Sequence, residues 1–359
     1  MTPLAMASPR RFRGGRWIGP VALAAALAAA SVGAAQADAP PAALSEPALH
    51  SPKALNAATL AVTRAGARLV AVGERGTVLL SDDAGATWRQ AKVPVQATLT
   101  TVRFVDAKKG WAAGHLGVIL SSDDGGESWT LQLDGLKAAQ AIAAAATGQD
   151  ERAQKAARRI VEEGPDKPFF DLEFVDAQRG YAVGAYSLAF ETRDGGKRWT
   201  PLALPNPKNL HLYGVRVAGG HAFIAGEQGL LLKSNDSGDG FTVLASPYKG
   251  SFFGLLATRS GALIAYGLRG NALRSADQGA SWDKLETGVT VSMSAAALLD
   301  GDALALLSQS GEVLLSRDDG KSFKKLPRTA EPVPAAGLAQ ADGQLVLASL
   351  RGTRRQPAP

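Results

Sequence analysis

Aspartates recur in this chain with a spacing that could support chemistry. They occupy the third position of an octapeptide, Ser/Thr-x-Asp-x-Gly-x-Ser/Thr-Trp/Phe, which is repeated six times. The six residues are Asp83, Asp124, Asp194, Asp236, Asp277 and Asp318. Aligned carboxylates could form a binding array. They could instead cap turns, because an aspartate side chain accepts hydrogen bonds from nearby backbone N–H groups.

The other positions of the octapeptide, which is the Asp-box or BNR pattern, favour the turn-capping role. Its glycine can adopt the positive φ that a tight hairpin requires, and its final aromatic residue can bury a ring between sheets. These aromatic residues are Trp88, Trp129, Trp199, Phe241, Trp282 and Phe323. Arg198 and Gly240 make the third and fourth copies degenerate. A turn at the outer edge of a sheet does not converge on a pocket, so we predict a structural role.

The spacing of the aromatic residues defines a long repeat. Successive copies lie 41, 70, 42, 41 and 41 residues apart. The long interval corresponds to one period plus an insertion of 29 residues. A period near forty residues with strand-like content is typical of the blades of a β-propeller.

A second repeated element, Gly-x-x-Gly or a variant of it, lies between two short apolar runs in every repeat. Such a pattern predicts a β-hairpin, and it matches no phosphate-binding fingerprint because no helix follows. Each blade then has four strands, which in the second blade are Leu99–Val105, Gly110–Ala113, Val118–Ser121 and Ser128–Leu131. The predicted blades span 54–94, 98–135, 168–205, 210–247, 251–288, 291–328 and 334–356. The fold class is therefore all-β, a seven-bladed β-propeller.

The seventh blade and the insertion depart from the repeat. Blade seven has no Asp-box, and we expect the segment 42–50 to supply its outer strand, because closure removes sheet edges that invite aggregation. The insertion at about 136–165 is rich in helix formers and ends at Gly164-Pro165, which predicts one or two short helices between blades two and three. A flexible Ala-rich loop is the alternative.

The first 37 residues predict a signal peptide. Four arginines precede an Ala-rich apolar run, and Ala35-Gln36-Ala37 fits the small-x-small cleavage pattern. An uncleaved membrane anchor is the alternative. Cleavage would leave the propeller as 38–359 and would lower the formal net charge from +6 to +2. So small a charge gives no argument for nucleic-acid binding, and the absence of Cys excludes disulfides and thiolate chemistry.

Three stretches of the chain resemble a known family. They are the segments 72–88, 104–129 and 168–186, which look like the repeats of photosystem II assembly/stability factors. The last two segments share the motif Phe-Val-Asp-x-x-x-Gly-Trp/Tyr-x-x-Gly. The resemblance implies a lumenal or periplasmic seven-bladed propeller that helps to assemble a membrane complex and is not an enzyme. With the predicted signal peptide, we expect a periplasmic scaffold whose partner is a membrane or exported protein complex, and we expect the chain to be a monomer.

The competing function is that of a sialidase-like glycoside hydrolase, because Asp-boxes are frequent in that group. Such an enzyme needs an arginine cluster, a Tyr–Glu pair and an acidic Asp. The five tyrosines of this chain show no repeated carboxylate partner, and its four histidines lack ligand spacing. We therefore predict no catalytic residues, no metal, no cofactor and no small-molecule substrate.

The remaining candidates for function lie at the hairpin tips. In a propeller, the turns between second and third strands share one face with the connections between blades, so they surround one mouth of the channel. Arginine and aromatic residues are enriched at protein interfaces. We therefore predict that this face binds the partner through Arg75, Arg269, Arg351, Tyr186 and His115. The alternative is that these are solvated turn residues.

Overall fold

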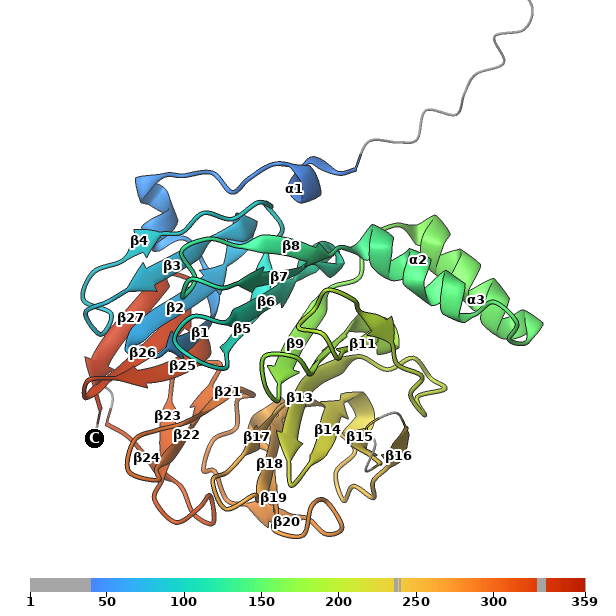
Figure 1. Ribbon diagram of the computed structural model, residues 1–359. Coiled ribbons are helices and arrows are strands. Elements are labelled where there is room, and N and C mark those ends of the chain that lie inside the picture. Colours follow the sequence, from blue (N-terminus) through green and yellow to red (C-terminus); the bar gives the residue numbers. More distant parts are fainter. Residues whose placement is uncertain (1–39, 236–237, 239, 328–333, 359) are drawn as a thin grey trace, which may run out of the picture. The chain divides into compact units, whose positions relative to one another are not determined.

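Antiparallel strands joined by short turns make up most of the unit Pro41–Pro359 in the computed structural model. The structure describes residues 40–235, 238, 240–327 and 334–358. The strands form seven sheets, of which six have four strands and one has three. Their inner strands converge on the middle of a ring (Figure 1), which confirms the seven-bladed propeller. The signal peptide expected at 1–37 lies outside the described residues.

Each blade has the same order of strands from the channel outward. The inner strands are β1 (Thr59–Ala65), β5 (Leu99–Phe104), β9 (Phe169–Phe174), β13 (Leu212–Ala218), β17 (Phe252–Ala257), β21 (Met293–Leu298) and β25 (Ala335–Ala341). The second strands are β2 (Arg68–Gly73), β6 (Gly110–Gly114), β10 (Gly180–Gly184), β14 (His221–Gly226), β18 (Leu263–Gly267), β22 (Leu304–Ser308) and β26 (Gln344–Ser349).

The outer half of each blade is shorter. The third strands are β3 (Val78–Ser81), β7 (Ile119–Ser122), β11 (Ala189–Thr192), β15 (Leu231–Ser234), β19 (Ala272–Ser275), β23 (Val313–Ser316) and β27 (Gly352–Pro357). The outermost strands are β4 (Arg89–Gln90), β8 (Thr130–Leu133), β12 (Thr200–Pro201), β16 (Phe241–Val243), β20 (Asp283–Leu285) and β24 (Lys324–Lys325).

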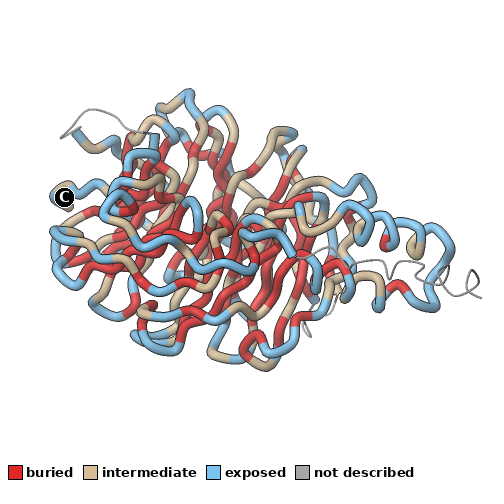
Figure 2. Tube along the Cα trace, turned by 90° about the horizontal axis from the view of Figure 1, so that it is seen from above, coloured by how far each residue is buried: buried red, intermediate tan, exposed pale blue. Residues whose placement is uncertain are grey.

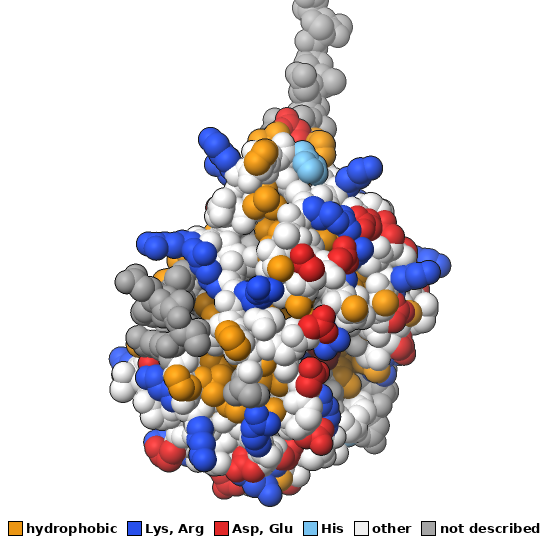
Figure 3. All heavy atoms as spheres, turned by 90° about the vertical axis from the view of Figure 1, so that its left-hand side faces the viewer, with side chains coloured by type: hydrophobic (Ala, Val, Ile, Leu, Met, Phe, Trp, Pro, Cys, Tyr) orange, Lys and Arg blue, Asp and Glu red, His pale blue; other side chains and the backbone are white. Residues whose placement is uncertain are grey.

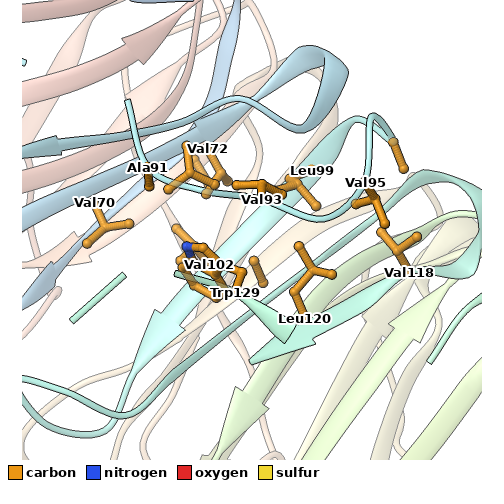
Figure 4. Close-up of a cluster of buried hydrophobic side chains, with 14 of the residues drawn as sticks. Val70, Val72, Ala91, Val93, Val95, Leu99, Val102, Val118, Leu120 and Trp129 are labelled. Atoms are coloured by element: carbon orange, nitrogen blue, oxygen red, sulfur yellow. The ribbon is translucent and has the colours of Figure 1, made fainter. Parts of the chain in front are cut away.

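The second and third strands read as continuous apolar runs because both of their faces are buried. In β2, Val70 and Val72 pack into the core between blades one and two, which Figure 4 shows. Leu69 and Ala71 of the same strand pack into the core between blades seven and one. Side chains alternate between the faces of a strand, so one strand contributes to two cores. Figure 2 shows the buried segments running through the ring.

Every inner strand contains a β-bulge directly after its first residue. In β1 the register shifts between Thr59 and Ala61, and in β9 it shifts at the residue between Phe169 and Asp171. The same shift occurs in the other five blades. A bulge leaves one extra residue outside the ladder and redirects its side chain. One residue of each blade is thereby placed at the end of the channel.

The prediction that the segment 42–50 completes blade seven is wrong, since that sheet has three strands. The segment forms a short helix, α1 (Ala42–Ser45), and then packs beside blade one, where Ala48 N–H donates to the carbonyl of Val93 (2.9 Å). Pro47 within it lacks a ladder donor. Blade seven instead ends at β27, where the charged side chains of Arg354 and Arg355 are exposed and protect the edge.

The ring closes through direct packing of β1 against β25. Thr59 Oγ1 donates to the carbonyl of Ser349 (3.3 Å) and accepts from its N–H (3.0 Å). Both residues are buried. Blades one and seven are therefore joined by contacts of β1 with β25 and β26, without an exchanged outer strand.

The insertion between blades two and three is a helical hairpin, as predicted. It consists of α2 (Gly135–Ala145) and α3 (Glu151–Glu163), which project away from the ring (Figure 1). Asp134 and Asp150 cap the two helices by accepting backbone N–H bonds, and Gly164, with φ of 77°, ends the second. Neither these helices nor any other in the described part of the chain is both long and apolar enough to cross a membrane.

Candidate functional site

The described Asp-box carboxylates are used within their own turns. In blade two, Asp124 Oδ1 accepts hydrogen bonds from Ser122 Oγ (2.8 Å) and from the N–H of Ser128 (3.0 Å), and Oδ2 accepts from Ser128 Oγ (2.5 Å). The first two bonds recur in the other described boxes, at Asp83, Asp194, Asp277 and Asp318. Asp236 lies outside the described residues.

These turns lie on the face opposite the hairpin tips and pack against the preceding blade. Trp111 of blade two donates from Nε1 to the carbonyl of Gly195 in the box of blade three (3.3 Å). A side chain on Gly320 of the blade-six box would meet Ile264 of blade five at 2.4 Å. Blade seven has no box, and the residue of blade six that is equivalent to Trp111 is the small Ala305. The boxes therefore fix the contact between neighbouring blades.

Hydrogen bonding within the turn stabilises the charged form of the carboxylates. The Thr87 hydroxyl, with the Thr87 N–H and the Ser81 hydroxyl, lowers the pKa of Asp83 from 3.8 to about 2. Burial works to raise the pKa of Asp124, but bonds from Ser128 and Ser122 outweigh it, so this pKa is also lowered. A carboxylate that is already satisfied by local donors is a poor candidate for a ligand site.

We expect Asp124→Ala to destabilise the fold by about 1–3 kcal/mol, because Ser122 Oγ and the Ser128 N–H lose their acceptor. Partner binding by the folded variant should not change. Urea unfolding followed by circular dichroism measures the first quantity, and affinity measured well below the unfolding midpoint measures the second. Loss of binding with unchanged unfolding would contradict the structural role.

The pH dependence of this difference is an internal control. Because the pKa of Asp124 is lowered in the folded state from its ordinary 3.8, its contribution is complete above that value and is lost as pH falls through the folded pKa. The gap between wild type and Asp124→Ala should therefore be constant at neutral pH and shrink below about pH 4.

The hairpin tips present all five residues predicted for partner binding. Arg75, Arg269, Arg351, Tyr186 and His115 are exposed, and each lies at the end of the blade where the inner strand begins. Arg75 and Arg351 are on adjacent blades, one and seven, while Arg269 is on blade five and the two remaining residues are on blades two and three. The structure thus distributes them around the mouth.

The hairpin tips carry three arginines and two glutamates. Among the described residues, Arg75, Arg269 and Arg351 form no ion pair. The two tip glutamates are held by backbone groups: Glu74 accepts from the N–H of Ala58 (3.2 Å) and Glu227 from that of His211 (2.8 Å). The arginines are therefore available to an acidic ligand.

The bulged residues of the inner strands form the channel mouth on the same face. They are Leu60, Thr100, Phe170, Tyr213, Phe253, Ser294 and Ala336. Three of them form what we name the aromatic crescent, with ring centroids 5.2 Å apart for Phe170 and Tyr213 and 5.4 Å apart for Tyr213 and Phe253. Tyr186 extends the aromatic surface outward through His211, at 4.6 Å between ring centroids.

Below the mouth, four charged residues form what we name the channel charge cluster. Asp171 accepts hydrogen bonds from Arg216 Nη1 (2.5 Å) and Arg103 Nη2 (3.3 Å). Glu173 Oε2 lies 3.7 Å from Arg216 Nη1. Burial raises the pKa of Glu173, which outweighs the lowering by Arg216 and Arg103. Two cations and two carboxylates face one another, so the cluster is internally compensated.

The repeats match those of a known protein family. The sequence model of the family described as "Photosynthesis system II assembly factor YCF48" matches residues 80–145 and 150–283. The chain belongs to this family. "Photosystem II assembly lipoprotein Ycf48" of Synechococcus sp. (strain CC9902) is 33% identical over 122 residues, which are 32% of this chain and 35% of the relative. This match thus spans about a third of the relative's length.

Solved structures share the fold. One described as "YCF48 bound to D1 peptide" has a TM-score of 0.63 and 15% identity, covering 88% of this chain and 96% of that one. A virginiamycin B lyase from Staphylococcus aureus has a TM-score of 0.66 and 9% identity, covering 88% and 98%. Because binding proteins and lyases share this architecture, the fold alone does not decide the activity.

The structure explains the motif on which the family resemblance rested. In Phe-Val-Asp-x-x-x-Gly-Trp, a side chain on Gly110 would meet the ring of Phe104 at 2.5 Å. Asp106 caps the intervening turn by accepting from the N–H groups of Lys108 and Lys109, both at 2.7 Å. Phe174, Asp176 and Gly180 repeat this arrangement in blade three. The motif thus builds an exposed turn whose closing glycine packs against the ring of its phenylalanine, not a ligand site.

Sequence analysis missed the aromatic crescent and the channel charge cluster. The sequence did contain a signal. Each bulged residue lies 13 or 14 positions before the first residue of the Gly-x-x-Gly element, or its variant, in the same blade. Aligning the repeats at the tips would have brought Phe170 and Phe253 into one column and Tyr213 into the adjacent one. No group of three or more His, Cys, Asp or Glu residues in the described ranges could hold a metal ion.

Proposed function

We propose that this chain is an exported, non-catalytic assembly scaffold whose tip face binds an acidic segment of a membrane or exported protein. The observation that carries the proposal is the set of three exposed tip arginines without acidic partners, next to two glutamates engaged by backbone N–H groups. Membership in a family described as assembly factors supports a binding role. The description of one similar structure as bound to a D1 peptide supports a peptide-like ligand.

The titratable groups that the structure gathers also support binding rather than catalysis. The Asp-box carboxylates are satisfied within their turns, and the channel charge cluster is compensated internally. The predicted signal peptide at 1–37 and a relative described as a lipoprotein support export. Turnover of a fluorogenic sialoside by the pure protein would favour the glycoside hydrolase instead.

The test is a triple charge reversal on the tips. We expect Arg75→Glu/Arg269→Glu/Arg351→Glu to abolish capture of the membrane or exported partner from a host membrane extract, because like charges would replace complementary ones. Wild-type capture should weaken with added salt, since exposed charges are screened within about 8 Å at physiological ionic strength. Quantitative mass spectrometry of the captured proteins provides the measurement.

A matched variant reverses three charges elsewhere. Lys321, Lys324 and Arg355 are exposed on the outer parts of blades six and seven, and their replacement by glutamate changes the net charge equally. Figure 3 shows basic and acidic side chains intermingled on the flank near β4 and β27. Equal loss of the partner in both triple variants, or retention in both with unchanged circular dichroism spectra, would exclude the tip face.

A further inference from the structure

We propose that the aromatic crescent is a pocket for one aromatic or large aliphatic side chain of an extended acidic peptide. This inference rests on the proposed function and names the subsite and ligand chemistry of the same face. The crescent adds a specific apolar contact to the charge attraction of the tips.

Asymmetry of the mouth is the first argument. Blades three to five place Phe170, Tyr213 and Phe253 at the bulge, whereas blades six and seven place Ser294 and Ala336 there. A hollow of about 110 Å³ lies beside the rings, and Ser294 and Ala336 are among the residues that line it. A wall of aromatic rings facing an open space is suited to stacking with an inserted side chain.

The rings are not required to close the propeller. All three are only partly buried, and blades six and seven form the same bulge with serine and alanine. Among the described residues, the Tyr213 hydroxyl has no hydrogen-bond partner, and burial raises its pKa. Three large side chains are thus held partly exposed at positions where small residues suffice structurally.

Charge around the crescent favours an acidic ligand on one side. The channel charge cluster below it is compensated, so it offers no net attraction to a cationic side chain. Of the tips outside it, that of blade four carries Glu227, whose charge acts on Tyr213, and those of blades five, seven and one carry Arg269, Arg351 and Arg75. A peptide whose carboxylates lie toward blades five, seven and one would therefore meet opposite charge at the rim.

The separation of the two features selects a peptide. Each tip joins the second and third strands of its blade, so it stands one to two strand spacings, roughly 5–10 Å, outside the inner strand that carries the crescent. Among the three arginines, Arg269 is on a blade that carries a crescent ring. An extended segment with an apolar residue flanked by carboxylates can contact the rings and Arg269 together.

The test uses short fluorescein-labelled peptides in a Gly-Ser background. The first has one Phe between two pairs of Asp, the second has Ala in place of Phe, and the third has Lys in place of each Asp. The crescent variant is Phe170→Thr/Tyr213→Ser/Phe253→Ala, which introduces residues that other blades carry at the bulge. Leu298→Ser is the control, since Leu298 lies at the other end of the channel and is also exposed.

We expect wild type to bind the Phe peptide about tenfold more tightly than the Ala peptide in fluorescence anisotropy. The crescent variant should bind both peptides with the affinity that wild type has for the Ala peptide. Leu298→Ser should bind both as wild type does. Circular dichroism spectra and melting temperatures establish that the variants are folded.

Three results would overturn the pocket: equal affinity of wild type for the Phe and Ala peptides, undiminished preference for Phe in the crescent variant, or tighter binding of the Lys peptide. The proposed function has a separate outcome. If the arginine reversals abolish partner capture while the crescent variant binds every peptide as wild type does, the tip face stands and the crescent does not.

Discussion

Replacing Asp171 with asparagine is expected to destabilise the folded protein by about 3–5 kcal/mol, the cost of leaving a buried charge without its partner. The Asp171 and Arg216 side chains are 8% and 10% exposed and lie 2.5 Å apart. Burial works to lower the pKa of Arg216, but Asp171 and Glu173 raise it, so this arginine stays charged. Asparagine keeps the shape of the side chain and removes the compensating charge.

Two further variants separate this explanation from general disruption. Because burial raises the folded-state pKa of Glu173 above its ordinary 4.5, the fold disfavours that charge, and Glu173→Gln should cost little or stabilise the protein at neutral pH. Adding Arg216→Met to Asp171→Asn should recover most of the loss. Urea unfolding of the four proteins gives the free energies. Equal destabilisation by Asp171→Asn and Glu173→Gln would contradict the assignment.

Trp111→Ala is expected to destabilise the protein by about 3–5 kcal/mol, as large cavities in cores do. The Trp111 side chain is fully buried between blades two and three, where it stacks on Phe174 with ring centroids 3.4 Å apart and an interplanar angle of 6°. Its Nε1–H also bonds the Asp-box carbonyl of Gly195. Truncation therefore removes both apolar contact and a donor at one blade interface.

The equivalent position of blade three supplies a graded comparison. Tyr181 pairs with Glu191 as Trp111 pairs with Ser121, so Trp111→Tyr fits the local backbone and should lose less stability than Trp111→Ala. Exposed Val243→Ala is the surface control. In thermal melts and urea titrations, Trp111→Ala should lose the most stability, Trp111→Tyr less, and Val243→Ala the least. A Trp111→Ala variant as stable as Val243→Ala would contradict the packing argument.

The number of blades and the helical insertion could be predicted from the sequence. Residues such as Asp124 and Trp129 mark the same turn in blade after blade, and the physical requirements of that turn are local. Gly164 ends the insertion because a left-handed residue terminates a helix whatever surrounds it. Local patterns determine elements whose hydrogen bonds close within a few residues.

Closure of the ring and composition of the channel were decided by tertiary structure. The segment at 42–50 had no local signal against pairing with β27 except Pro47, and the tertiary contacts of β1 with β25 and β26 closed the ring without it. Asp171 and Arg216 belong to different blades, and their contact depends on how the inner strands converge. The one-residue bulge that places Tyr213 at the mouth is a shift in the pairing of β13 with β14, so it depends on the neighbouring strand. Residues distant in the chain meet there because ring geometry, rather than sequence periodicity, brings the inner strands together.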